Sequence, residues 1–235
     1  MKLFELVFFP SFCKICGQFL ESPMERVLCR SCLDKIAPER AASCPSCGRF
    51  FEGAGEPHLC LSCLKGPAPF SIHRSGARYQ RELKDAILLF KYRRYRTLGK
   101  NMARFVAEAL KKEDGLWSGV DIIVPVPLHR RRLRDRGFNQ AEVIAKEISR
   151  LKRIPLEKKA LKKVRNIPAQ TSLEHQERMK NVRDVFEPRR EERIRDKVVL
   201  LVDDVYTTGS TLRESAAALK RGGAKEVRAV TVAQA

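Results

Sequence analysis

The eight cysteines constrain the fold of this chain more than any other feature. All lie before residue 64, in four pairs with the spacing Cys-x-x-Cys, and twelve residues separate the two pairs within each half. The context repeats too, since "CKICGQF" at 13–19 matches "CPSCGRF" 31 positions later. This internal duplication indicates two copies of one small unit. The copies contain Cys13, Cys16, Cys29 and Cys32, and then Cys44, Cys47, Cys60 and Cys63.

Each copy has a spacing typical of a four-cysteine zinc site. Units of about 20 residues build little hydrophobic core, so bound metal would supply much of their folding free energy. Disulfides are disfavoured in the cytosol, and a redox motif does not need four copies in register; an iron–sulfur site is the remaining competitor. The tandem repeat favours one ion per copy, while the cysteine order alone leaves an interleaved pairing open.

Positive charge is concentrated after the cysteine region. The formal net charge is +19, and residues 71–235 hold 39 of the 47 basic residues but 21 of the 28 acidic ones. Such a region attracts polyanions, although a solvated surface or a thermophilic bias gives the same composition. Because four thiolates make each zinc site negative, the ribbons themselves are better suited to a structural or protein-docking role than to nucleic acid.

The chain shows no sign of a membrane segment. No apolar run approaches the roughly 20 residues that a membrane helix needs. The N-terminal "MKLFELVFF" is broken by Glu5 and lacks a small-residue cleavage site, so we expect a cytoplasmic protein. The linker composition of "KGPAPF" at 65–70 divides the chain into a double zinc ribbon at 1–66 and a larger domain at 67–235.

Continuous apolar segments alternate with amphipathic ones in the larger domain. A polar stretch at 162–185 is expected to be a mobile loop or a loop plus helix. The alternation predicts a parallel α/β sheet, with ligands at the carboxyl ends of its strands. Strands are expected at 71–80 (or a hairpin), 120–127, 154–157, 197–204 and 226–235, and helices from Gln80, at 101–112, from Asn139 and at 210–221, with basic loops at 91–100 and 130–136.

The segment "VVLLVDDVYTTGST" at 198–211 ends a buried strand in two carboxylates and a hydroxyl-rich turn. A Walker B aspartate would need a P-loop, but neither GxxxxGK[ST] nor GxGxxG occurs in the chain. The N–H groups at a helix start favour an anion, and glycine allows its close approach. The carboxylates would repel phosphate but accept hydrogen bonds from a diol. We therefore predict a ribose 5-phosphate site formed by Asp203, Asp204, Thr207, Thr208, Gly209, Ser210 and Thr211.

This segment resembles the signature that binds phosphoribosyl pyrophosphate (PRPP) in type I phosphoribosyltransferases. The stretches "PVPLHRRRLRDRGFNQAE" at 125–142 and "FKYRRYRTLGK" at 90–100 resemble the ComF family, competence-associated proteins of this fold. So do the cysteine repeats and the spacing of Gln170, Leu173, Arg178 and Asn181. The resemblance covers essentially the whole chain. It implies the class α/β, with a parallel-sheet type I phosphoribosyltransferase domain preceded by a small double zinc-ribbon domain.

The resemblance also implies roles for individual residues. Phosphoribosyl transfer replaces the pyrophosphate of PRPP by a nitrogen nucleophile, with Mg²⁺ bridging pyrophosphate and ribose oxygens. Asp203 and Asp204 would then be the catalytic pair. The segment with Gln170, Arg178 and Asn181 would close as a lid, unless it is a plain surface loop. Pyrophosphate or nucleic acid, which the sequence does not separate, would contact Pro127, Leu128, Arg132, Arg134 and Arg136.

Two functions of different classes follow. The first is a PRPP- and Mg²⁺-dependent phosphoribosyltransferase whose acceptor no motif identifies. The second is a non-catalytic factor that binds single-stranded DNA, with PRPP as a regulator or a vestigial ligand. The resemblance implies DNA uptake, natural transformation or use of imported DNA, with the ribbons available to proteins of the uptake machinery. Tyr79, Tyr92 and Tyr95 lie among basic residues and suit base stacking, whereas Phe90 follows an apolar helix face.

Overall fold

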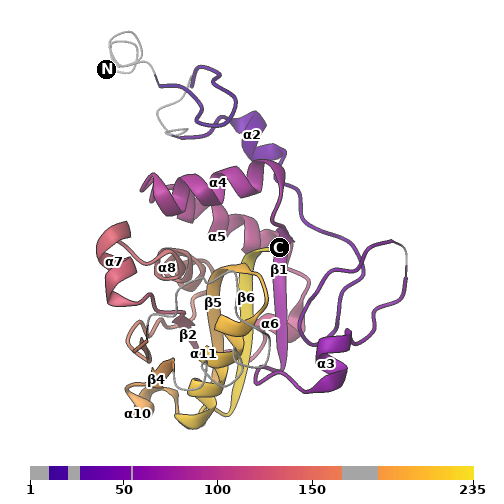
Figure 1. Cartoon of the computed structure of the whole chain (residues 1–235), viewed down its shortest axis with the longest axis vertical. Helices are drawn as coiled ribbons and strands as arrows, with labels where there is room; N and C mark the ends of the chain where they lie inside the picture. Colours follow the sequence, from indigo (N-terminus) through magenta and orange to yellow (C-terminus); the bar gives the residue numbers. More distant parts are fainter. Residues whose placement is uncertain (1–10, 21–26, 54, 166–184) are drawn as a thin grey trace.

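The computed structural model describes residues 11–20, 27–53, 55–165 and 185–235. Its centre is a parallel sheet with the strand order β1-β6-β5-β2 (Figure 1). The strands are β1 (Ile72–Arg78), β2 (Ile122–Pro125), β5 (Val198–Tyr206) and β6 (Glu226–Gln234). The strand expected at 154–157 is reduced to one parallel bridge, between Leu156 and Ile123 on the outer side of β2.

Helices cover both faces of the sheet, as the uniformly apolar strands predict. Alternate residues of β5 feed two cores: Leu200 and Val202 pack on the side of α4, α5 and α8, and Leu201 packs on the side of α11. Within the described residues, none of the helices is both long and apolar enough to cross a membrane. The four covering helices are α4 (Arg81–Tyr92), α5 (Leu98–Ala109), α8 (Gln140–Lys152) and α11 (Ser210–Arg221).

Of the two basic segments expected to be loops, 91–100 is a loop only at its centre and 130–136 is helical, so the first expectation was wrong in part and the second was wrong. Residues 91 and 92 end α4, and α5 begins at Leu98, three residues earlier than expected, which leaves a loop of 93–97. The arginine cluster forms α7 (Arg130–Arg136), which ends at Gly137 in the left-handed conformation, with φ +77°. Arginine is a good helix former, and a left-handed glycine is a common end signal, so local propensity outweighs charge repulsion here.

Several short elements gave no periodic signal in the sequence. Three-residue strands cannot show an alternation, which explains why the β3–β4 pair at the borders of 166–184 was missed. The first of these strands begins one residue before the segment at 162–185 that was expected to be a loop, and it ends inside that segment. The short elements are α2 (Arg30–Asp34), α3 (Leu61–Lys65), α6 (Asp114–Trp117), α10 (Glu191–Ile194) and the antiparallel strands β3 (Leu161–Lys163) and β4 (Phe186–Pro188).

The chain leaves β2 and β5 in opposite directions. From β2 it runs through α7 and α8 to the outer edge of the sheet, whereas from β5 it runs through α11 back to β6. Such a switch point opens a crevice at the carboxyl ends of the two strands, and open α/β sheets bind their ligands there. The acidic pair and the hydroxyl-rich turn lie at this edge.

The close approach of α5 to α8 gives a test of the packing. A Cβ on Gly99 would lie 2.5 Å from Cγ1 of Val143 and 2.9 Å from Cζ of Phe90. We expect Gly99→Ala to lower the free energy of unfolding by about 1–3 kcal/mol in urea denaturation, because the half-buried Val143 and the buried Phe90 must shift. The control is Gly115→Ala, whose Cβ would meet its nearest atom at 3.9 Å. Equal stabilities of the two variants would contradict this packing.

Candidate functional site

The cysteines gather into two groups that follow the sequence repeat. Within each group the four sulfur atoms lie within 4.8 Å of one another, and sequential pairing is therefore confirmed over interleaved pairing. Both copies share the same knuckle: Gly17 and Gly48 have positive φ, and each donates its N–H to the carbonyl four residues earlier at 2.9 Å. The groups are Cys13, Cys16, Cys29 and Cys32, and Cys44, Cys47, Cys60 and Cys63.

The chemistry of both groups fits zinc. Burial raises the pKa of Cys13 and Cys44, but hydrogen bonds from backbone N–H groups outweigh it and lower both values to about 6. The first thiol of each copy is therefore available as a thiolate at neutral pH. Four sulfur ligands in a closed cluster are typical of structural zinc.

The two aspartates lie in the second half of β5, and alternation along the strand directs them to opposite sides of the sheet. Asp204 is 8% exposed, and its Oδ1 lies 2.9 Å from Nζ of Lys91, which comes from the last turn of α4. Oδ1 of Asp203 accepts the backbone N–H of Asp204 at 2.9 Å. Each carboxylate therefore has its own environment, with the ion pair on the α4 side.

Two carboxylates and three cations set the electrostatics of this edge. Burial and the charge of Asp204 raise the pKa of Asp203 to about 7, against the opposing charges of Lys91 and Lys163. Burial and the nearby Arg132 lower the pKa of Lys163. Among the described residues, neither Lys163 nor Arg132 has a carboxylate within ion-pair distance. This pair of cations is therefore suited to an anionic ligand.

The hydroxyl-rich turn has the geometry of an anion site. Gly209, with φ +77°, is the N-cap of α11 and has no side chain to cap the helix, while the N–H of Ser210 donates to Oγ1 of Thr208 at 3.4 Å. The hydroxyls of Thr208 and Ser210 lie 3.0 Å apart, and both residues are exposed. Asp203 and the turn lie together around one small cavity of about 20 Å³. It is lined by Asp203, Val205, Tyr206, Thr207, Gly209, Thr211 and Leu212.

The arginines of α7 diverge. Arg132 is near Lys163, while Nη1 of Arg136 donates to Oε1 of Gln140 at 3.0 Å and its guanidinium covers the ring of Tyr92. Arg134 is exposed. The structure therefore brings one of the three predicted arginines toward the acidic pair. Pro127 and Leu128 are half-buried between β2 and α7.

The junction "GFNQ" between α7 and α8 has a structural role. Phe138 is buried against Phe90, with ring centroids 5.3 Å apart. Asn139 accepts the N–H of Ala141 at 3.2 Å and donates to the carbonyl of Val126 at 2.9 Å, so it caps α8 and holds the loop after β2. These residues fix the position of α7 relative to the carboxyl end of β2.

Gln170, Arg178 and Asn181, the predicted lid residues, lie outside the described residues, so their role stays a prediction. Sequence reasoning missed Lys91 and Lys163. The signal for Lys91 was its position directly after Phe90, which lies on an apolar helix face. Lys91 itself was assigned to the loop expected at 91–100. Lys163 carried no signal, because its strand has only three residues.

Comparisons with known proteins agree with this architecture. Residues 98–235 match the family model of the phosphoribosyl transferase domain, and residues 5–64 match that of the double zinc ribbon domain. The models leave 65–97 unassigned, so the predicted boundary at 66 and 67 stays a prediction. Competence protein F of Haemophilus influenzae is 31% identical over 160 residues, which are 67% of this chain and 70% of that protein.

Two further matches cover a smaller part of this chain. DNA utilization protein YhgH of Escherichia coli K12 is 37% identical over 108 residues, 46% of this chain and 47% of that protein, so the match spans about half of each. A crystal structure of a purine phosphoribosyltransferase from Pyrococcus horikoshii has a TM-score of 0.35 and 23% identity, over 57% of this chain and 70% of that one. At that TM-score it adds nothing to the family match.

The chain is thus a phosphoribosyltransferase-fold protein with an N-terminal double zinc ribbon. Within that class, the match to competence protein F and the combination of the two domains identify its family. The chain belongs to the ComF family.

The raised pKa of Asp203 predicts that replacing this carboxyl stabilises the protein by an amount that depends on pH. The pKa of the Asp203 carboxyl is about 7 in the folded state and lower in the unfolded state. This carboxyl therefore stabilises the fold fully at a pH below its unfolded pKa, and the stabilisation is lost as the pH rises through 7. Asp203→Asn should therefore be more stable than the wild type at pH 8, and this gain should exceed that at pH 5 by about 1–2 kcal/mol after solvent screening. Thermal unfolding at both pH values measures it, with the exposed Asp135→Asn as control. A gain that does not change with pH would contradict the assignment.

Proposed function

We propose that the carboxyl edge of β2 and β5 binds PRPP with Mg²⁺, and that the protein transfers its phosphoribosyl group in the cytoplasm. The observation that carries this proposal is that Asp203 lines one cavity with Thr207, Gly209 and Thr211 of the turn, at the switch point of the sheet. A turn at a helix N-terminus suits the 5-phosphate, and a carboxylate a few residues earlier suits the ribose hydroxyls. A metal ion alone would not require the turn.

Different residues of the site contact different parts of the ligand. The 5-phosphate lies against 207–211, and Asp203 accepts from the ribose hydroxyls and supports the metal. Arg132 and Lys163 receive the pyrophosphate, since neither has a carboxylate within ion-pair distance among the described residues, although the charge of Asp203 acts on Lys163. Lys91 compensates the charge of Asp204 next to Asp203 through their ion pair. When bound, Mg²⁺ would neutralise pyrophosphate charge as the bond to C1 of the ribose lengthens.

Transfer at such a site depends on positioning and charge neutralisation rather than on a covalent intermediate. In the proposed arrangement, the cations lie on the leaving-group side and the carboxylates on the ribose side, where positive charge develops. No motif identifies the acceptor of the phosphoribosyl group. An assay of pyrophosphate release from PRPP across nitrogen nucleophiles, with and without single-stranded DNA, tests whether transfer occurs and to what.

Arg132 separates PRPP from simpler phosphate ligands. PRPP with Mg²⁺ should raise the melting temperature of the wild type by mass action. Arg132→Met should weaken PRPP binding about tenfold, because a charge-assisted contact to pyrophosphate is lost, and should leave ribose 5-phosphate binding unchanged. The matched control is Arg134→Met, an exposed arginine of the same helix. Calorimetric titration measures all three proteins, and a wild type that does not respond to PRPP would overturn the proposal.

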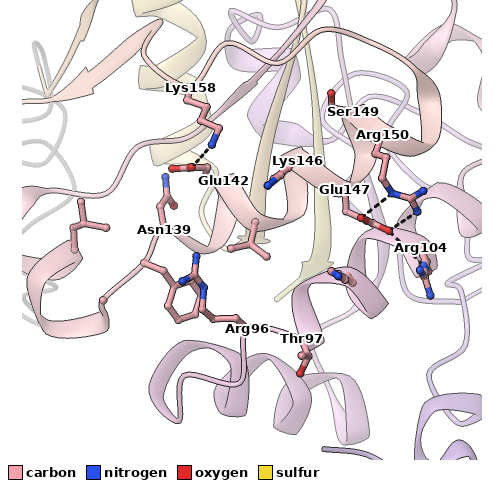
Figure 2. Close-up of a pocket in the computed structure, with 15 residues that line it drawn as sticks. Arg96, Thr97, Arg104, Asn139, Glu142, Lys146, Glu147, Ser149, Arg150 and Lys158 are labelled. Atoms are coloured by element: carbon pink, nitrogen blue, oxygen red, sulfur yellow. Dashed lines mark hydrogen bonds and ion pairs between the residues drawn. The ribbon is translucent and has the colours of Figure 1, made fainter. Parts of the chain in front are cut away.

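A second candidate function, binding of single-stranded DNA, is favoured by a groove between α5 and α8. This cavity has a volume of about 1020 Å³, and side chains of both helices line it (Figure 2). Its lining includes six basic and two acidic residues. The basic residues are Arg96, Lys100, Arg104, Lys146, Arg150 and Lys158, and the acidic ones are Glu142 and Glu147.

Both acidic residues of the groove are already paired, so the groove has an excess of positive charge. Oε1 of Glu142 lies 2.8 Å from Nζ of Lys158, and Oε1 of Glu147 lies 2.8 Å from Arg150 (Figure 2). The names of competence protein F and of YhgH associate those relatives with competence and DNA utilization. We therefore propose that this chain handles imported DNA, with the groove holding the sugar–phosphate backbone.

Salt dependence and charge reversal test the groove. Affinity for a single-stranded oligonucleotide should fall steeply with salt, because bound phosphates release counterions. Lys100→Glu combined with Lys146→Glu should weaken binding at least tenfold and reduce the salt slope. Lys225→Glu, on the loop after α11 and outside the groove lining, is the control. Fluorescence anisotropy measures the affinity, and unchanged binding by the groove variant would count against this surface.

A further inference from the structure

The two copies of the cysteine repeat differ in what their knuckles contact. A Cβ on Gly17 of the first copy would meet nothing within 4 Å. A Cβ on the equivalent Gly48 would lie 2.3 Å from the backbone oxygen of His73 in β1. The second knuckle is therefore packed directly on the sheet, whereas the first is open.

Three consecutive residues of the second knuckle bind β1 through their carbonyl groups. Ser46 accepts the backbone N–H of His73 at 2.8 Å, and the carbonyl of Cys47 lies 2.7 Å from Nδ1 of the same histidine. The carbonyl of Pro45 accepts from Arg74 at 3.0 Å. His73 is fully buried, so the cysteine turn forms part of the interior of the larger domain.

A stacked pair of rings continues from this knuckle to the turn at 207–211. His73 stacks on Tyr206, with ring centroids 4.4 Å apart and planes 20° apart. Tyr206 is 3% exposed and is the last residue of β5. A Cβ on Gly209 would lie 2.3 Å from the hydroxyl oxygen of Tyr206, so the turn rests directly on this ring.

A second contact links the other cysteine pair of the same copy to this turn. Nη2 of Arg213, in the first turn of α11, lies 3.9 Å from the sulfur of Cys63. The N–H of Arg213 donates to the carbonyl of Gly209 at 2.9 Å. With metal bound, the thiolates of the second copy carry negative charge, which strengthens their attraction for this guanidinium.

The first copy is attached elsewhere. Its cysteines share a core with residues of α4, α5 and α8, and Lys35 lies 3.9 Å from Glu82 of α4. The second copy shares its core with Tyr206 and Leu212, which flank the turn. Equivalent ligands of the repeat therefore support different parts of the larger domain.

We propose that the second four-cysteine unit, with its metal bound, positions the turn at 207–211 for phosphate, and that the first unit does not. Tyr206 and Arg213 act as positioning residues, through the ring under Gly209 and the contact to Cys63. The phosphate half of this inference rests on the proposed PRPP site. Loss of metal from the second unit would release the knuckle from His73 and remove the support of the turn.

Matched glycine substitutions test the inference without removing a metal ligand. Gly48→Ala and Gly17→Ala place alanine at similar positive φ values, +63° and +74°, so both carry the same kind of backbone strain. Only the former displaces its knuckle from the sheet. We expect Gly48→Ala to weaken PRPP binding at least tenfold by calorimetry and to increase amide hydrogen exchange at 207–213, with zinc content unchanged. Gly17→Ala should match the wild type in both.

A second pair removes the equivalent ligands Cys63 and Cys32. Cys63→Ser should lower zinc content and PRPP affinity together, while Cys32→Ser should lower zinc content alone. Equal exchange at 207–213 in Gly48→Ala and Gly17→Ala would overturn the inference, as would equal PRPP affinity in Cys63→Ser and Cys32→Ser. A wild type that does not bind PRPP would defeat the proposed function, while the exchange data would still decide whether the second unit positions the turn.

Discussion

Two adjacent carboxylates at the end of a strand that is buried on both faces set the central electrostatic constraint of this fold. Unpaired charge in such a position would be costly. The strand alternation separates the pair, Lys91 compensates Asp204, and Asp203 is left with a pKa raised to about 7. α4 must therefore extend far enough to place Lys91 over the sheet. Because one partner of a buried ion pair cannot be lost without leaving a charge behind, the position of α4 and the chemistry of the edge are linked.

Much of the fold could be predicted because its signals are local and strong. The cysteine spacing gave both metal groups, and apolar periodicity gave the strands of the sheet and the bounds of α11. The errors lie where charge was taken as a sign of a loop. Arg130 to Arg136 and Lys91 are helical because arginine and lysine are good helix formers and Gly137 supplies the end signal.

The candidate site was less accessible from sequence. The acidic pair and the turn are contiguous, so one motif predicted them. Lys163 and Arg132 approach the same edge only through tertiary packing, since they lie in a three-residue strand and a helix far apart along the chain. Composition could not distinguish Arg132 from Arg134 and Arg136, which differ only in where one turn of α7 directs them.

The duplication shows why identical motifs need not have identical roles. Both copies fold alike, with the same glycine knuckle and the same sulfur cluster, so the repeat itself carries no difference in function. The difference comes from the surface on which each copy packs. The second copy lies against His73 and Tyr206, at the carboxyl edge where β5 ends, and the first lies near α4. A metal site that is structural in its own unit thereby becomes part of the support of a turn more than 140 residues further along the sequence.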